Sequence, residues 1–212
     1  MKLERIATFP GAFVLAKPSG LACHRSELVR DRVTVASLLR EELGTPAYLV
    51  HRLDRGTSGC LLVATHAEAV PPWAERLAHG TKTYTALVRG FFPWDDPFTI
   101  ETPLSDGKGG TVTARTTLRC LRRTREPRCS LLQAQPDTGR FHQIRRHLRD
   151  LGYPILGDSS HGDTRVNQVW RRDHGLTRLA LHCAELDLGD GAVVRCPMPE
   201  ELSEVLRRVG LG

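Results

Sequence analysis

The sequence predicts an α+β fold in which a mixed, largely antiparallel β-sheet is flanked by helices. Strand-like segments occur in clusters with few helices between them, which favours antiparallel pairing over an alternating strand–helix arrangement. Apolar residues make up 40% and charged residues 25% of the 212 residues, as in an ordinary globular protein. This length suits one domain, and we expect a single domain over residues 1–212.

The first half of the chain predicts short strands and two helices. Apolar segments predict strands at residues 13–16, 47–50 and 61–64. From Thr34, apolar residues recur at helical spacing until Gly44, which predicts a helix ending there. A second helix is predicted over residues 72–79, before Gly80.

The second half predicts further strands and two more helices. Strand-like patterns occur at residues 84–89, 111–121, 130–134, 181–188 and 192–195. A helix is predicted over Arg140 to Leu151, with a buried apolar stripe of Phe141, Ile144, Leu148 and Leu151. A closing helix begins at Pro199 and stops at Gly210.

The charge distribution indicates an anionic partner. The net charge is +6, and ten arginines between Arg115 and Arg149 face only Glu126 and Asp137. Such clustering is typical of proteins that bind phosphate-rich ligands, although a basic composition alone also occurs without one.

Several classes of protein are disfavoured. No apolar run approaches the ~20 residues of a membrane span, and the N-terminus lacks a signal peptide, so we expect a cytoplasmic protein that does not bind membranes. The six cysteines are spaced singly, which argues against a zinc ribbon or a thioredoxin-like site. His142 and His147 are five residues apart and lack an acidic cluster, so no metal site is predicted.

The stretch H-R-L-D-R-G-T-S-G, residues 51–59, places Asp54 between two arginines. Asp54 is either a local ion pair or cap, or a carboxylate whose charge serves chemistry. A kinase catalytic loop has another residue order, and a glycosidase would need a second carboxylate. In T-G-R-F-H-Q-I-R-R-H-L, Arg145 lies at the border of the apolar stripe, where it suits a buried carboxylate. Its stem could instead cover the core while its charge reaches water.

Five ordered motifs together resemble the RluA-type pseudouridine synthases. They are K-P-S-G-L-A-C-H-R-S, H-R-L-D-R-G-T-S-G-C-L-L-V-A, K-T-Y-T-A-L-V-R-G, T-G-R-F-H-Q-I-R-R-H-L followed by G-Y-P-I-L-G-D, and R-L-A-L-H-C-A-E-L. The resemblance runs from about Val14 to Leu188. It implies the catalytic fold of that family, with a central active-site cleft, and an isomerisation of uridine to pseudouridine without metal or organic cofactor.

The resemblance also assigns roles to residues. Asp54 matches the essential aspartate, Arg145 the basic partner that would keep it charged, and Tyr84 the active-site tyrosine. Arg52 matches an arginine that enters the space left by the target base or contacts phosphate, and Arg55 would be a phosphate contact. Three further residues would face the RNA backbone: Arg140, His142 and Gln143.

Within the family, H-R-S at 24–26 and G-D-S-S-H-G-D-T-R-V-N at 157–167 are most similar to the branch that modifies tRNA at uridine 65. Large-subunit ribosomal RNA is the alternative substrate, and a non-catalytic RNA chaperone on the same fold is the alternative function. Cys23 and Cys60 replace larger aliphatic residues, with an expected effect on packing. No S4-type RNA-binding domain is recognisable, and we expect a monomer that binds RNA through loops and the basic face.

Overall fold

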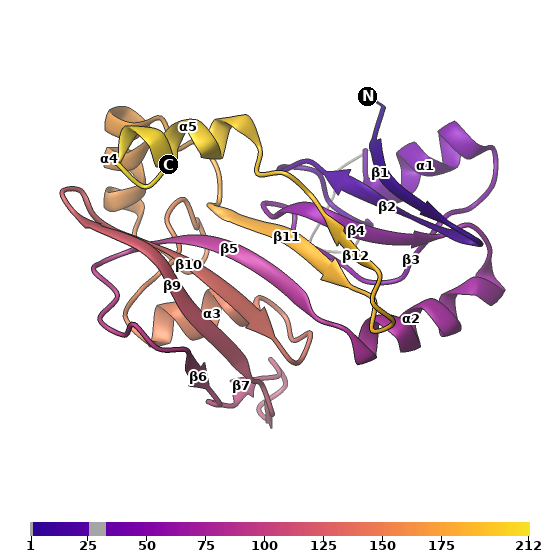
Figure 1. Ribbon diagram of the computed structural model, residues 1–212, viewed down its shortest axis with the longest axis horizontal. Helices are drawn as coiled ribbons and strands as arrows, with labels where there is room; N and C mark the ends of the chain where they lie inside the picture. The colour runs from indigo at the N-terminus through magenta and orange to yellow at the C-terminus, as the bar shows by residue number, and fades with distance from the viewer. Residues whose placement is uncertain (1, 26–32) are drawn as a thin grey trace. The chain divides into compact units, whose positions relative to one another are not determined.

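The computed structural model describes residues 2–25 and 33–212, and the chain divides into two compact units (Figure 1). The first unit consists of Met1–Lys82 with Cys183–Pro197, and the second of Thr83–His182 with Met198–Gly212. Compactness of a unit does not establish that it folds alone, so the single domain over residues 1–212 stays a prediction. Ser26, the last residue of the H-R-S motif, lies outside the described residues.

The first unit is organised around one fully buried strand. β4 is buried at all of its residues, and it lies between β2 and β3, both antiparallel to it. β1 pairs antiparallel with β2, and β11 with β12. The strands are β1 (Glu4–Phe9), β2 (Ala12–Lys17), β3 (Tyr48–Leu49), β4 (Ser58–Ala64), β12 (Val193–Arg195) and β11 (Leu181–Asp187), whose first two residues belong to the second unit.

Both predicted helices of the first unit are confirmed. α1 (Val35–Leu43) begins at a capping box, in which Thr34 and Ser37 satisfy each other's backbone N–H groups, and ends at Gly44. α2 (Val70–His79) follows a 3₁₀ turn (Ala67–Ala69), carries prolines in its first turn, and buries Trp73 and Leu77. Prolines are tolerated there because the first backbone N–H groups of a helix have no partner within it.

The second unit contains an antiparallel sheet and a separate small hairpin. β10 pairs antiparallel with β5 on one side and with β9 on the other, β6 pairs with β9, and β7 pairs with β8. The strands are β5 (Lys82–Arg89), whose first residue belongs to the first unit, β6 (Phe98–Ile100), β7 (Leu104–Ser105), β8 (Thr111–Val112), β9 (Thr116–Arg125) and β10 (Arg128–Pro136). The predicted mixed, largely antiparallel sheet flanked by helices is therefore confirmed.

The helices of the second unit are α3 (Gln143–Asp150), α4 (Thr164–His174) and α5 (Glu200–Arg208). α3 packs against β9 and β10 (Figure 1). At the far end of α4, the Nη1 of Arg208 from α5 donates to the carbonyl of His174. Among the described residues, no helix is long and apolar enough to cross a membrane.

One helix prediction was wrong, and one helix was missed. The helix predicted from Arg140 begins only at Gln143, because His142 has a left-handed backbone with φ of 52°. Phe141 therefore lies outside the helical periodicity, and it is 61% exposed instead of buried. α4 was not predicted, although Val166, Val169 and Trp170 have helical spacing; only Trp170 is buried in the structure. The clearest sequence signals of α4 are its caps. The Asp163 side chain accepts hydrogen bonds from backbone N–H groups of the first turn, and Gly175 ends the helix.

Gly59, the last residue of H-R-L-D-R-G-T-S-G, is required by both backbone conformation and space. Its φ is +117°, and a Cβ there would lie 2.1 Å from the carbonyl oxygen of Cys183. Both residues belong to the first unit, where this close approach brings β4 against the backbone of β11. A side chain at position 59 would push the two backbones apart.

We therefore predict that Gly59→Ala lowers the free energy of unfolding by about 3 kcal/mol or more, because no side-chain rotation relieves the clash. Gly107→Ala is the matched control: its φ is +77° but a Cβ there meets nothing within 4 Å. The control should cost only about 1 kcal/mol. Urea denaturation measures both, and equal costs for the two variants would contradict the role given to the contact with β11.

Candidate active site

The loop that carries Asp54 is fixed by the K-P-S-G segment of the same unit. Lys17 is 1% exposed, and its Nζ donates to the carbonyl oxygens of Pro18 at 2.8 Å and Arg55 at 3.4 Å. The hydroxyl of Ser19 donates to the carbonyl of Gly56 at 2.7 Å. These bonds satisfy carbonyl groups that a tight loop would otherwise leave unpaired, so two motifs distant in sequence form one rigid structure.

Arg55 also connects the Asp54 loop to the K-P-S-G segment. The N–H of Gly20 donates to its carbonyl at 2.8 Å, and the Nε of Arg55 donates back to the carbonyl of Gly20 at 3.1 Å. Arg55 remains exposed, as does Arg52. The charge of Arg52 lowers the pKa of His24, although burial lowers that pKa more. Arg52 therefore lies on the side of the loop that faces residues 23 and 24.

Asp54 lies half-buried within this loop, where its carbonyl accepts from the N–H of Thr57 at 3.0 Å. The preceding residue, Leu53, is held by Cys23, whose Sγ lies 3.3 Å from the carbonyl and 3.4 Å from the N–H of Leu53. Burial raises the pKa of the Cys23 thiol. The thiol therefore stays protonated, and it contributes hydrogen bonds to the Asp54 loop in addition to the packing expected from sequence.

His51 at the start of the motif is a half-buried residue with a structural role. Its Nε2 accepts from the backbone N–H of Leu62 in β4 at 3.0 Å. Burial, and then the charge of Lys82, lowers the pKa of His51 to about 3. The ring is therefore neutral at physiological pH and anchors the motif to β4. The sequence alone did not show whether His51 has a structural role or takes part in the reaction.

In the second unit, Tyr84 lies on β5 opposite Ala134 of β10 and is 8% exposed. The strand thus holds the aromatic ring by its backbone on one side of the sheet. Asp54 belongs to the first unit, whereas Tyr84 and Arg145 belong to the second. The grouping of these three side chains in one site stays a prediction.

Arg145 is 7% exposed and forms a two-point ion pair with Asp158, which is 1% exposed. Its Nε donates to Oδ2 and its Nη2 to Oδ1 of Asp158, both at 2.8 Å. The sequence placed Arg145 at a position suited to a buried carboxylate, and Asp158 is such a carboxylate. Asp158 ends the quoted G-Y-P-I-L-G-D stretch, but no role was predicted for it.

Asp158 is ionised despite its burial. Burial is the largest influence and would raise its pKa, but the hydrogen bonds and charge of Arg145 act in the opposite direction. The backbone N–H groups of Ser160 and His161 add bonds of 2.9 Å each to Oδ1. Together these groups hold the pKa of Asp158 below its ordinary value of 3.8.

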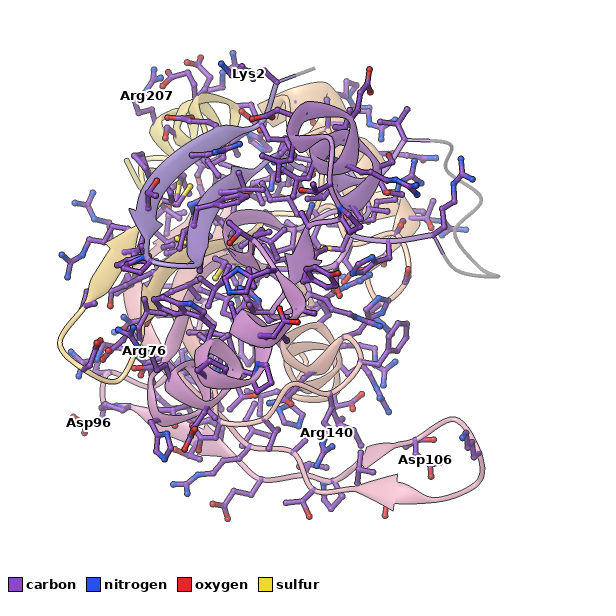
Figure 2. All side chains as sticks on the ribbon, turned by 90° about the vertical axis from the view of Figure 1, so that its right-hand side faces the viewer. Lys2, Arg76, Asp96, Asp106, Arg140 and Arg207 are labelled. Carbon is purple, nitrogen blue, oxygen red and sulfur yellow. The ribbon has the colours of Figure 1, made fainter. Side chains whose placement is uncertain are left out.

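The residues at the start of α3 have different environments. Gln143 is 4% exposed, and its amide bonds to Thr138, Thr116 and the backbone of Arg115 and Arg140. The direct RNA contact expected of Gln143 stays a prediction, while the structure uses this side chain to hold the loop before α3. The Nε of Arg140 donates to the carbonyl of Thr113 at 3.1 Å, beside the β7–β8 hairpin that carries Asp106 (Figure 2).

His142 follows, and its Nδ1 lies 2.9 Å from the Nε2 of His161. Phe141 stacks on the His142 ring, with 3.7 Å between ring centroids. Among the described residues, no group of three or more histidine, cysteine or acidic side chains could hold a metal ion. Phe141, His142 and His161 form a cluster of aromatic rings.

We predict that Asp158→Asn lowers the free energy of unfolding by about 3–5 kcal/mol, because it leaves the buried charge of Arg145 without its counter-charge. The folded-state pKa of Asp158 lies below 3.8, so the stabilisation is complete above that pH and is lost as the pH falls. Acidification should therefore destabilise the wild type more steeply than the variant.

Urea denaturation at neutral and acidic pH measures both effects. Asp173→Asn is the matched control, because Asp173 pairs with Arg172 on the surface of the same unit. The control should leave the free energy of unfolding nearly unchanged. Similar effects of the two substitutions would contradict the importance of burial.

Comparisons with known proteins agree with the motifs. Residues 12–150 match the family model described as RNA pseudouridylate synthase. A tRNA pseudouridine synthase C from Salmonella typhi is 33% identical over 98% of this chain and 90% of that protein. One from Pectobacterium carotovorum is 36% identical over 81% of this chain and 51% of that protein. The solved structure of human RNA pseudouridylate synthase domain containing 4 has the same fold, with a TM-score of 0.77 at 22% identity over 97% of this chain and 92% of that one.

Proposed function

The chain belongs to the RNA pseudouridylate synthase family, and on this premise we propose that it isomerises uridine 65 of tRNA to pseudouridine. The enzyme is an RNA pseudouridine synthase. The observation that carries the proposal is the loop of Asp54, whose carbonyl groups are held by Lys17, Ser19 and Gly20. A carboxylate on so rigid a loop is prepared for a fixed position against a substrate.

The reaction is an intramolecular exchange. The N1–C1′ bond of uridine breaks, the uracil turns while it is held, and a C5–C1′ bond forms. The C5 proton leaves and N1 gains a proton, so that the product has the same composition as the substrate. In the proposal, ionised Asp54 acts at the ribose as nucleophile or as base, and no organic cofactor or metal takes part.

Arg145 would keep Asp54 ionised. A guanidinium has five N–H groups, and the pair with Asp158 uses Nε and Nη2. In this role the positive charge of Arg145 would attract the negative charge of Asp54. At ~4 Å and an effective dielectric of about 20, that attraction amounts to about 4 kcal/mol before desolvation. Asp158 would then act as a positioning residue, because it fixes the orientation of the guanidinium.

The remaining residues would bind the RNA. Tyr84 would stack on the target base, and its hydroxyl would assist proton transfer. A base inside folded RNA leaves its stack at a cost of a few kcal/mol, and Arg52 would enter the vacated space or contact phosphate. The other expected contacts are Arg55, Arg140, His142 and Gln143. We also propose that the enzyme acts as a monomer in the cytoplasm.

We predict that Asp54→Asn abolishes pseudouridine formation while folding and tRNA affinity are retained, because the amide keeps the shape of the carboxylate but lacks its charge. Asp96→Asn is the control, since Asp96 is an exposed carboxylate on the loop between β5 and β6. Pseudouridine mapping of tRNA incubated with each variant measures activity. Substantial residual activity of Asp54→Asn would refute the assignment.

Mapping total RNA from cells with and without the gene tests the substrate. Loss of pseudouridine only at tRNA position 65 supports the proposal. Loss in large-subunit ribosomal RNA would replace it with the ribosomal alternative. A missing effect on pseudouridine, with an effect on tRNA folding, would favour an RNA chaperone.

We further predict that tRNA affinity falls steeply with salt, because most arginines of the Arg115–Arg149 segment are available to phosphates. Among the described residues, those that form no ion pair with an acidic side chain are Arg119, Arg122, Arg125, Arg128, Arg140 and Arg146. Each phosphate contact contributes a slope of about −0.7 to −0.9 in a plot of log affinity against log salt. Affinity measured by filter binding that does not respond to salt would contradict this basic surface.

A further inference from the structure

Phe141 is exposed in a way that its local structure enforces. The ring is 61% exposed, and it stacks on His142 at 3.7 Å with an angle of 20° between the planes. His142 has φ of 52° and ψ of 31°, a conformation that residues other than glycine adopt uncommonly. A single exposed apolar residue is ordinary, but one presented by an unusual backbone conformation and supported by a second ring suggests a use.

The support beneath Phe141 is rigid. The Nδ1 of His142 lies 2.9 Å from the Nε2 of His161, so one of these two nitrogens donates a hydrogen bond to the other. They meet edge to face, with centroids 5.1 Å apart. The backbone N–H of His161 donates to Asp158, the partner of Arg145. The stack is thus connected through hydrogen bonds to a buried ion pair of the same unit.

Arginines surround the stack. The Nη1 of Arg146 donates to the carbonyl of Ser105 at 3.0 Å and lies 3.5 Å from the carbonyl of Phe141. The Nη1 of Arg149 lies 3.3 Å from the Nδ1 of His161. Arg140 precedes Phe141 in the chain. Among the described residues, Arg140 and Arg146 have no acidic partner, so their charge is available to an anion.

We propose that the Phe141–His142 stack, which we term the aromatic platform, binds an unpaired RNA base, with its flanking phosphates on Arg140 and Arg146. Aromatic faces combined with arginines are the features by which proteins hold unstacked bases and their phosphates. The platform rests on the proposed function, which supplies an RNA with a base displaced from its stack. It adds a binding position for a base other than the target, supported by residues connected to Arg145.

The first test compares three substitutions at one exposed position. Phe141→Ala should weaken binding of a tRNA transcript by roughly 5- to 150-fold, the range typical of a lost base stack. Phe141→Leu should remain weak, because it restores apolar volume without an aromatic face, whereas Phe141→Trp should restore affinity. Val169→Ala is the control, because Val169 is also an exposed apolar residue of this unit, at 42% exposure, and it should bind as the wild type does.

Salt dependence separates stacking from charge. Phe141→Ala should lower tRNA affinity at every salt concentration and leave the salt slope unchanged. Arg146→Gln should reduce the magnitude of that slope by about 1, as expected for one phosphate contact. A reduced slope for Phe141→Ala would show that the substitution displaces the arginines, and it would overturn the stacking role.

The second test removes the base instead of the side chain. The full-length wild type and Phe141→Ala are titrated with a single-stranded oligouridylate and with an oligomer of equal length and charge that lacks the bases. The variant should be weaker than the wild type only on oligouridylate. An equal loss on both oligomers would overturn the proposal, as would wild-type tRNA affinity of Phe141→Ala or of Phe141→Leu.

The platform and the proposed function fail in different measurements. Absence of pseudouridine formation by the wild-type protein on tRNA would refute the proposed function, whereas wild-type affinity of Phe141→Ala would refute only the platform. If the exposed ring served a protein partner instead, oligouridylate and tRNA would bind equally well to the wild type and to Phe141→Ala. Circular dichroism of each variant verifies that the fold is retained.

Discussion

The buried ion pair of Arg145 with Asp158 determines the arrangement of several segments in the second unit. Arg145 lies on α3, whereas Asp158 lies in the turn after it, and Oδ1 of Asp158 also accepts two backbone N–H groups. A buried carboxylate is tolerated only where such partners meet its charge. Because the guanidinium, the turn and the backbone groups satisfy one another, displacement of any one would leave a buried charge exposed to an apolar interior.

The same turn also explains a long stretch of sequence in physical terms. In G-D-S-S-H-G-D-T-R-V-N, Gly157 is required because a Cβ would lie 1.9 Å from the carbonyl of Arg178. Asp163 caps α4, and the Asn167 side chain bonds to the N–H of Gly157 and the carbonyl of Asp158, each at 2.9 Å. The motif is therefore a hydrogen-bonded structure around Asp158. Several of its residues have structural roles that require no contact with a substrate.

Sequence patterns were sufficient where one local rule determined the outcome. The helix at Val35–Leu43 followed from apolar spacing and its glycine end, and Leu61 lay in the predicted buried strand. Sequence patterns failed at Phe141, because the left-handed backbone of His142 ends the helical periodicity. His51 and Asp158 could not be assigned structural roles, since their partners lie on other segments. The motifs identified where Asp54 and Arg145 lie, but not the hydrogen bonds that orient them.

Rigid support and exposed binding groups are separated consistently in this chain. Lys17 and Gln143 are polar residues with buried side chains, His51 is half-buried, and each bonds to a backbone carbonyl or N–H. These groups form hydrogen bonds to the protein itself. The exposed groups, such as Arg52 and Phe141, carry charge or aromatic surface instead. A substrate whose base must be displaced requires both properties, because exposed groups bind it strongly only when their positions are fixed in advance.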